Sequence, residues 1–183
     1  MDNTTLIIVA AVVALAVAAL AFFVERRRRL RQQFGPEYER AVRDAGGTTR
    51  AEAELAARAK RVSQYHIRPL SPEDGSRFSA AWRQLQERFV DDPAGAVNEA
   101  DRLVTDLMAK RGYPMADFDR RAADLSVDHA NVVTHYREAH DIVTSAPDTR
   151  RVSTEDLRRA VQHYRALFED LLEIGGSPSR RPA

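Results

Sequence analysis

The fold is set by the stretch SPEDGSRFSAAWRQLQERF, residues 71–89, which combines a helix start with an apolar helix face. Ser71 precedes Pro72 and is followed three residues later by Asp74, an order that predicts an N-cap, a first helical residue and a reciprocal capping contact. Large apolar side chains then recur at spacings of four, three and four residues, which places them on one face of a helix. These side chains are Phe78, Trp82, Leu85 and Phe89, and we expect them to anchor a hydrophobic core.

Three more long helices are predicted downstream by the same kind of signal. Their starts are expected at Asp92, Asp128 and Ser153, and their ends at Gly112, Pro147 and Gly175. Ser153 with Asp156 repeats the capping arrangement, and a short helix is expected near residues 116–125. The inward faces are Val97, Ala100, Val104, Leu107 and Met108; Val132, Val133, Tyr136, Ala139 and Val143; and Leu157, Val161, Tyr164, Phe168 and Leu171.

The segment before this bundle predicts a helical neck. Gly35 and Pro36 interrupt the chain and start a short helix over 37–44. Thr49 is then expected to cap a helix over 50–64, with an apolar stripe of Leu55, Ala59 and Val62. No stretch of the sequence shows convincing strand alternation, so the predicted fold class is all-α.

A run of nineteen uncharged residues, Leu6–Val24, precedes the neck. As a helix it would be about 28 Å long, close to the hydrocarbon thickness of a bilayer. A buried core helix of this length usually has a polar face, and a cleaved signal peptide carries its positive charge before the apolar run. The sequence therefore favours a single N-terminal transmembrane helix that contacts the lipid bilayer.

The orientation of that helix is predicted by the arginines that follow it, Arg26, Arg27, Arg28, Arg29 and Arg31. Short segments rich in arginine stay on the cytoplasmic side, so the N-terminus is expected outside and the C-terminal domain in the cytoplasm. The same side chains could lie at the membrane interface among anionic headgroups. Ala10, Ala14 and Ala18 share one helix face, so the chain could also form a homo-oligomer through its span.

The predicted organisation has four parts. Residues 1–33 form the transmembrane anchor with its arginine cluster, 34–66 the helical neck, 67–175 the helical bundle and 176–183 a disordered tail. The chain has 183 residues, a net charge of +1 and no cysteine. That composition excludes disulfides and thiolate metal sites, and the balanced charge argues against a nucleic-acid partner.

Catalytic motifs are not evident in the sequence. There is no Cys nucleophile, no Gly-x-Ser-x-Gly and no glycine-rich phosphate loop, so we predict no enzyme, no catalytic residue and no cofactor. The candidates for a metal site are His135, Glu138 and His163, because the first two are three residues apart and the third lies on the following helix. These histidines lie in two similar segments of the chain, VTHYREA at 133–139 and VQHYRAL at 161–167, which we call the echo segments.

The strings FVDDPAGAVNEADRLV, RGYP, RAADLSVDH and VVTHYREAH resemble an uncharacterised bacterial family of small, often membrane-anchored helical proteins. The similarity covers about residues 67–172, and the family pattern commonly has Pro where this chain has Ala130. The resemblance implies a bacterial origin, and hence a bacterial inner membrane, and a helical domain. It implies no activity and no cofactor.

Two functional hypotheses follow from these features. The first is a membrane-tethered cytoplasmic interaction or scaffold domain with a protein partner of unknown identity. Tyr113, Pro114 and Phe118 would be its partner surface if they are exposed, although they could instead fill the end of the bundle. The alternative is a membrane-bound metal- or ligand-binding enzyme that uses the histidines of the last two helices.

Overall fold

The computed structural model describes residues 3–173, with side chains for residues 7, 8 and 11–172. Within this range the chain is helical and has no strand, which confirms the all-α prediction. The helices are α1 (Asn3–Phe34), α2 (Pro36–Asp44), α3 (Thr48–Val62), α4 (Pro72–Arg88), α5 (Pro93–Arg111), α6 (Phe118–Asp128), α7 (Ala130–Thr144), the 3₁₀ helix η1 (Thr149–Arg151) and α8 (Thr154–Glu173). The predicted tail over 176–183 and the helix end at Gly175 lie outside the described residues.

The helices divide into two compact units, one up to residue 56 and one from residue 57 onward. In the first unit, the C-terminal part of α1 packs with α2 and the start of α3. The buried side chains that join them are Leu30, Phe34, Tyr38, Ala41, Ala51 and Leu55. Gly35 separates α1 from α2 with a φ of 46°, a backbone conformation that a glycine adopts without strain.

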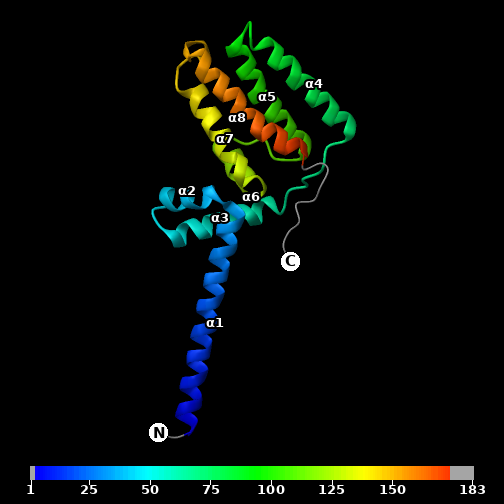
Figure 1. Ribbon diagram of the computed structural model, residues 1–183. Helices are drawn as coiled ribbons and strands as arrows, with labels where there is room; N and C mark the ends of the chain where they lie inside the picture. Colours follow the sequence, from blue (N-terminus) through cyan, green and yellow to red (C-terminus); the bar gives the residue numbers. More distant parts are fainter. Residues whose placement is uncertain (1–2, 174–183) are drawn as a thin grey trace. The chain divides into compact units, whose positions relative to one another are not determined.

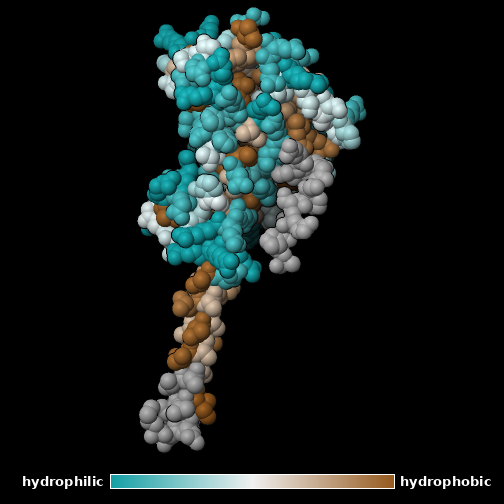
Figure 2. All heavy atoms as spheres, viewed as in Figure 1, coloured by the Kyte–Doolittle hydropathy of each residue, from teal (hydrophilic) through white to brown (hydrophobic). Residues whose placement is uncertain are grey.

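The N-terminal part of α1 exposes its apolar side chains in every direction. The large ones are between 55 and 70% exposed, and Figure 2 shows apolar colour along this helix. They are Ile7, Ile8, Val12, Val13, Leu15, Val17, Leu20, Phe22, Phe23 and Val24. Among the residues that the structure describes, no helix combines the length and the apolar character needed to cross a membrane.

The second unit contains the bundle, in which α7, α8, α5 and α4 lie side by side in that order (Figure 1). The chain runs up α4, down α5, up α7 and down α8, so α8 is antiparallel to α7 and parallel to α5. Helix α8 therefore has a neighbour on each side. It contributes the buried residues Leu157, Ala160, Tyr164, Leu167, Phe168 and Leu171 to the core.

The predicted caps form at three of the helix starts. Ser71 Oγ accepts from the Asp74 amide at 3.0 Å, and Ser153 Oγ accepts from the Asp156 amide at 3.1 Å. The Asp92 carboxylate accepts from the Gly95 amide at 2.9 Å. Each bond satisfies an amide that the first turn of a helix leaves without a backbone partner.

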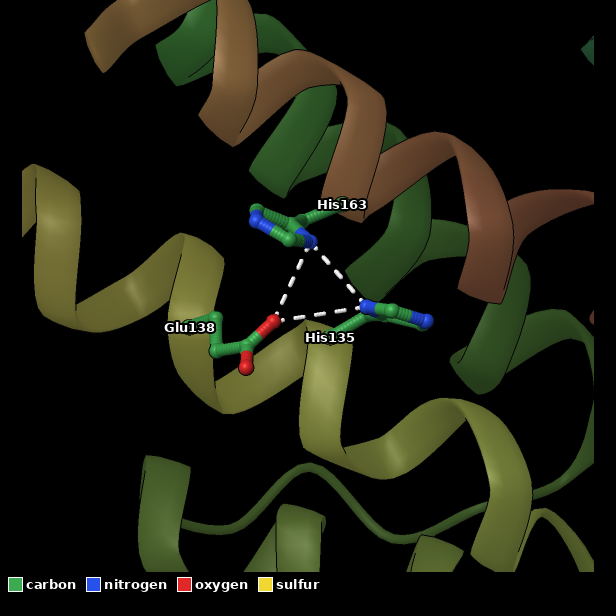
Figure 3. Close-up of side chains that lie close together, drawn as sticks. All are labelled: His135, Glu138 and His163. Atoms are coloured by element: carbon green, nitrogen blue, oxygen red, sulfur yellow. Dashed lines mark hydrogen bonds and ion pairs between the residues drawn. The ribbon is translucent and has the colours of Figure 1, made fainter.

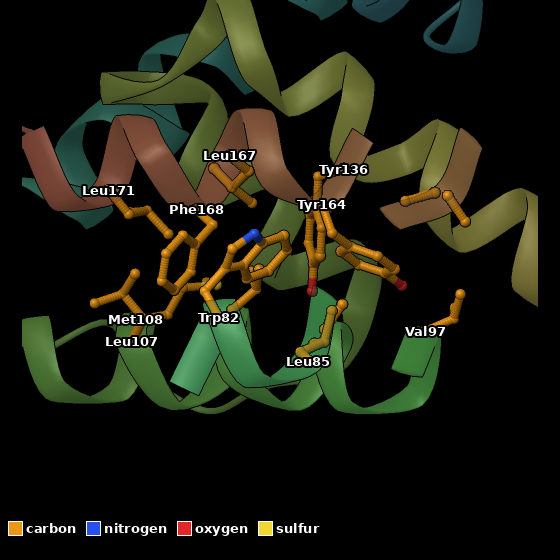
Figure 4. Close-up of a cluster of buried hydrophobic side chains, with 14 of the residues drawn as sticks. Trp82, Leu85, Val97, Leu107, Met108, Tyr136, Tyr164, Leu167, Phe168 and Leu171 are labelled. Carbon is orange, nitrogen blue, oxygen red and sulfur yellow. The ribbon is translucent and has the colours of Figure 1, made fainter. Parts of the chain in front are cut away.

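The predicted core is confirmed at most positions. Trp82 stacks on Phe168 with ring centroids 4.5 Å apart, and both lie among buried residues of α5 and α8 (Figure 4). Of the predicted inward positions, Phe89, Val132, Val143 and Val161 are only partly buried and pack at the margin of the core. Burial of this contiguous apolar set is the main favourable contribution to folding of the unit.

Gly112 ends α5 in the left-handed conformation, with φ at 99°. A Cβ atom added there would lie 2.5 Å from the carbonyl oxygen of His66, in the segment that leads into α4. The same segment is bound to the end of α5, because the Arg68 amide donates to the Arg111 carbonyl at 2.9 Å. Glycine is therefore required both by the backbone angle and by this close approach.

Two predicted helix starts are wrong by one or two residues. Asp128 was expected to cap the helix that contains His135, but it is the exposed last residue of α6. His129 instead separates α6 from α7, and its carbonyl accepts from the amides of Val132 and Val133. Helix α3 begins at Thr48, so Thr49 lies inside the helix rather than at its cap.

We expect Met108→Ala to lower the free energy of unfolding by about 2–5 kcal/mol, because truncating a fully buried side chain leaves a cavity in the core. The matched control is Met115→Ala, since Met115 is 49% exposed and its truncation should cost less than about 0.5 kcal/mol. Chemical denaturation of both variants measures the difference. Equal losses for the two variants would show that α5 does not form the core.

Candidate functional site

The three sequence-predicted metal candidates come together on adjacent helices. His135 and Glu138 lie one turn apart on α7, and His163 faces them from α8 (Figure 3). Helices α7 and α8 are antiparallel, and the His-Tyr pair of one echo segment meets the His-Tyr pair of the other. Tyr136 meets Tyr164 edge-on with centroids 6.1 Å apart, and His135 stacks beside His163 with centroids 5.2 Å apart.

Three side-chain atoms converge at the centre of this cluster. His135 Nδ1 lies 3.1 Å from His163 Nδ1, and Glu138 Oε2 lies 3.4 Å from the first nitrogen and 3.3 Å from the second. Figure 3 shows the three atoms facing one another between α7 and α8. Nitrogen from imidazole and oxygen from carboxylate are ligand types of divalent transition metals.

The cluster sits at the boundary between core and solvent. The side chains of His135 and Glu138 are 44 and 48% exposed, and that of His163 is 26% exposed. Burial lowers the pKa of His163 below the ordinary value of 6.5, and the neighbouring His135 and Arg159 act in the same direction. The carboxylate of Glu138 opposes the shift. The lowered pKa of His163 favours its neutral imidazole, which has a lone pair available to a ligand.

A buried network around His129 was missed by the sequence analysis. His129 Nδ1 pairs with the Asp170 carboxylate on α8, and His129 Nε2 lies 3.0 Å from the Tyr113 hydroxyl. Burial raises the pKa of Tyr113 far above 10, so its hydroxyl stays protonated and donates or accepts hydrogen bonds only. The network thus joins the residue between α6 and α7 to the end of α8.

A second network, around Asp124, was also missed. The buried Asp124 carboxylate accepts from Arg61 Nε at 2.9 Å through Oδ1 and from the Tyr65 hydroxyl at 2.8 Å through Oδ2. The Arg61 and Tyr65 side chains lie about sixty residues earlier in the chain. The two donors thus satisfy both oxygens of this buried carboxylate.

The sequence-predicted partner surface does not form as a unit. Pro114 is exposed, but Tyr113 is 3% exposed and lies within the core. Phe118 is half-buried and stacks on His140, with ring centroids 3.5 Å apart, and on Tyr136. Tyr113 is therefore not exposed as the hypothesis required, and its hydroxyl lies beside the buried His129.

The arginine cluster belongs to the first unit, where some of its side chains form ion pairs with nearby carboxylates. Arg27 Nε donates to Glu52 Oε1 at 2.9 Å, and the same oxygen accepts from the Tyr38 hydroxyl at 2.8 Å. Arg29 pairs with Glu25, and Arg31 lies 3.6 Å from Glu39. Arg26 and Arg28 complete the cluster on the same helix.

Comparisons with family models, with curated proteins and with solved structures find no match to this chain.

We expect Asp124→Ala to lower the free energy of unfolding by about 3 kcal/mol, because it leaves Arg61 and Tyr65 without their acceptor. This is the lower end of the range for a broken buried ion pair, since 24% of the Arg61 side chain still meets water. Asp119→Ala, which removes an exposed carboxylate from the first turn of the same helix, should cost less than about 1 kcal/mol. Urea denaturation compares the two, and a similar small loss would mean that the network contributes little.

Proposed function

We propose that this protein is a single-pass membrane protein that holds a helical interaction domain next to the bilayer. The observation that carries the proposal is the apolar surface of α1. Its large side chains from Ile7 to Val24 are exposed on all sides of the helix. A helix that is apolar all round is stable only inside a large core or inside a membrane.

The uncharged run Leu6–Val24 is nineteen residues long. Taken as a whole, the run has the length and the lack of charge of a transmembrane helix. Helix α1 continues without a break from this run into the arginine cluster, so the charges would stand at one membrane surface.

The arginines support a cytoplasmic position for the C-terminal domain. Transfer of arginine across the hydrocarbon core is costly, whereas the segment Met1–Thr5 carries little charge. We therefore propose that the N-terminus faces outward across a bacterial inner membrane. The pairing of Arg27 with Glu52 leaves this argument in place, because acidic residues contribute little to the orientation of a span.

A binding role suits the second unit better than catalysis. Its interior is occupied by the side chains of the core, among them the fully buried Tyr136, Tyr164 and Leu107. Its surface carries interleaved charges, such as Arg88 beside Glu99 and Lys110 beside Asp74. Mixed charge on a rigid helical surface is suited to a protein partner.

The absence of cysteine from the chain makes the topology directly testable, because an introduced cysteine is the single thiol. We expect Asn3→Cys to react with a membrane-impermeant maleimide in spheroplasts. Val90→Cys, at a position that is 82% exposed, should react only after lysis. The protein should also remain in the membrane pellet after carbonate extraction. Release by carbonate, or the reverse labelling pattern, would refute the proposed topology.

The contribution of the arginines has its own test. Replacing all five arginines of the cluster by glutamine should weaken the orientation signal. Labelling of Val90→Cys in intact spheroplasts is then expected to rise from background to a measurable fraction of the molecules. An unchanged pattern would mean that features other than the arginine cluster determine the orientation.

A further inference from the structure

We propose that His135, Glu138 and His163 bind one divalent metal ion of the zinc class, which bridges α7 and α8. This inference goes beyond the proposed anchored interaction domain and does not depend on it. It stands on the convergence of three ligand atoms from two helices within 3.1–3.4 Å of one another.

Each of the three facing atoms can offer a lone pair to a metal ion, since imidazole nitrogen and carboxylate oxygen are both acceptors. The three atoms lie 3.1–3.4 Å from one another. One cation at the centre would therefore accept all three lone pairs together.

The spacing of the three atoms favours a tetrahedral geometry. For metal–ligand distances of about 2.0–2.1 Å, ligand atoms are separated by about 3.3–3.4 Å in a tetrahedral site and by about 2.8–3.0 Å in an octahedral one. Two of the observed separations, 3.3 and 3.4 Å, match the tetrahedral value, and the third, 3.1 Å, lies between the two geometries. A metal about 2.05 Å from each atom would stand roughly 0.8 Å out of their plane, against about 0.7 Å in a regular tetrahedron.

The donor types narrow the choice of metal. Ca²⁺ and Mg²⁺ prefer oxygen ligands, and a set with two imidazoles disfavours them. Two nitrogens and one oxygen suit Zn²⁺ and ions of similar character such as Co²⁺. The side chains of His135 and Glu138 are nearly half exposed, so the fourth position opens to solvent and would be taken by water.

The surroundings permit coordination with small adjustments. The two imidazole rings are inclined by 23°, and rotation about χ2, a soft torsion, can bring each lone pair toward the metal. Arg159 is the cation whose charge reaches His163, and it is paired with Asp156 one turn away. Because His135 and Glu138 are held on one rigid helix, little order must be created when the metal binds.

The direct test is a titration of the full chain in detergent micelles, purified without a polyhistidine tag. Isothermal calorimetry with Zn²⁺ should give one ion per chain. Co²⁺ should give the intense visible absorption of a tetrahedral complex. His135→Ala, His163→Ala and Glu138→Gln should each weaken binding by about tenfold or more. Nitrogen chemical shifts of the two imidazoles should identify Nδ1, rather than Nε2, as the bound atom.

Two control variants remove a histidine and leave the cluster intact. His66→Ala removes an exposed imidazole, and His140→Ala removes one from the same helix as His135. Both should keep the affinity and the stoichiometry of the unchanged protein. Glu138→Gln keeps the shape of the side chain, so a loss of binding in that variant with an unaltered circular dichroism spectrum cannot be ascribed to unfolding. Absence of Zn²⁺ binding, or binding that survives unweakened in the His163→Ala and Glu138→Gln variants, would overturn the proposal.

Discussion

The interaction on which the bundle depends is the burial of the apolar face of α8 between α5 and α7. Phe168 reaches Trp82 of α4, and Tyr164 meets Tyr136 of α7, so α8 touches each of the other long helices of this unit. Its end is also fixed, because the buried Arg111 of α5 donates from Nη1 to the Leu171 carbonyl at 2.8 Å. Since the packing of α8 sets the register of α7, it also determines which polar residues of the two helices meet at the surface. The His135–Glu138–His163 cluster is a product of that register.

Much of the fold was predictable because its signals are local. Caps such as Ser71 and Asp92 act within one turn, and a stripe such as Phe78, Trp82 and Leu85 needs only the period of a helix. The error at the start of α7 occurred because a distant residue determines where that helix begins. His129 was not expected to separate two helices, because its side chain is held inside by Asp170, 41 residues later. The burial of Tyr113 follows from the same network and could not be read from its neighbours.

The candidate site was predictable in part, for a related reason. The spacing of His135 and Glu138 places them on one face of a helix, which follows from the sequence alone. The position of His163 opposite these two residues depends on how α7 and α8 are aligned. The spacing of residues along the sequence does not predict that alignment. The similarity between residues 133–139 and 161–167 partly indicated this contact. In the structure the two histidines of these segments lie beside each other, and so do the two tyrosines. The Asp124 network gave no comparable signal, since its partners lie about sixty residues away on an unrelated segment.

Trp82 is the single tryptophan of the chain, and it lies in the core with 5% of its surface exposed. Its indole ring is stacked on Phe168, so its surroundings depend on the contact between α4 and α8. The indole fluorescence of the protein, excited selectively over that of its tyrosines, therefore originates at one known place, and a shift of this emission to longer wavelength reports water reaching that place. The N-terminal helix and the neck contain no indole and contribute nothing to this emission. The chain thus carries its own optical reporter of bundle integrity, which works unchanged in micelles or vesicles without an attached dye.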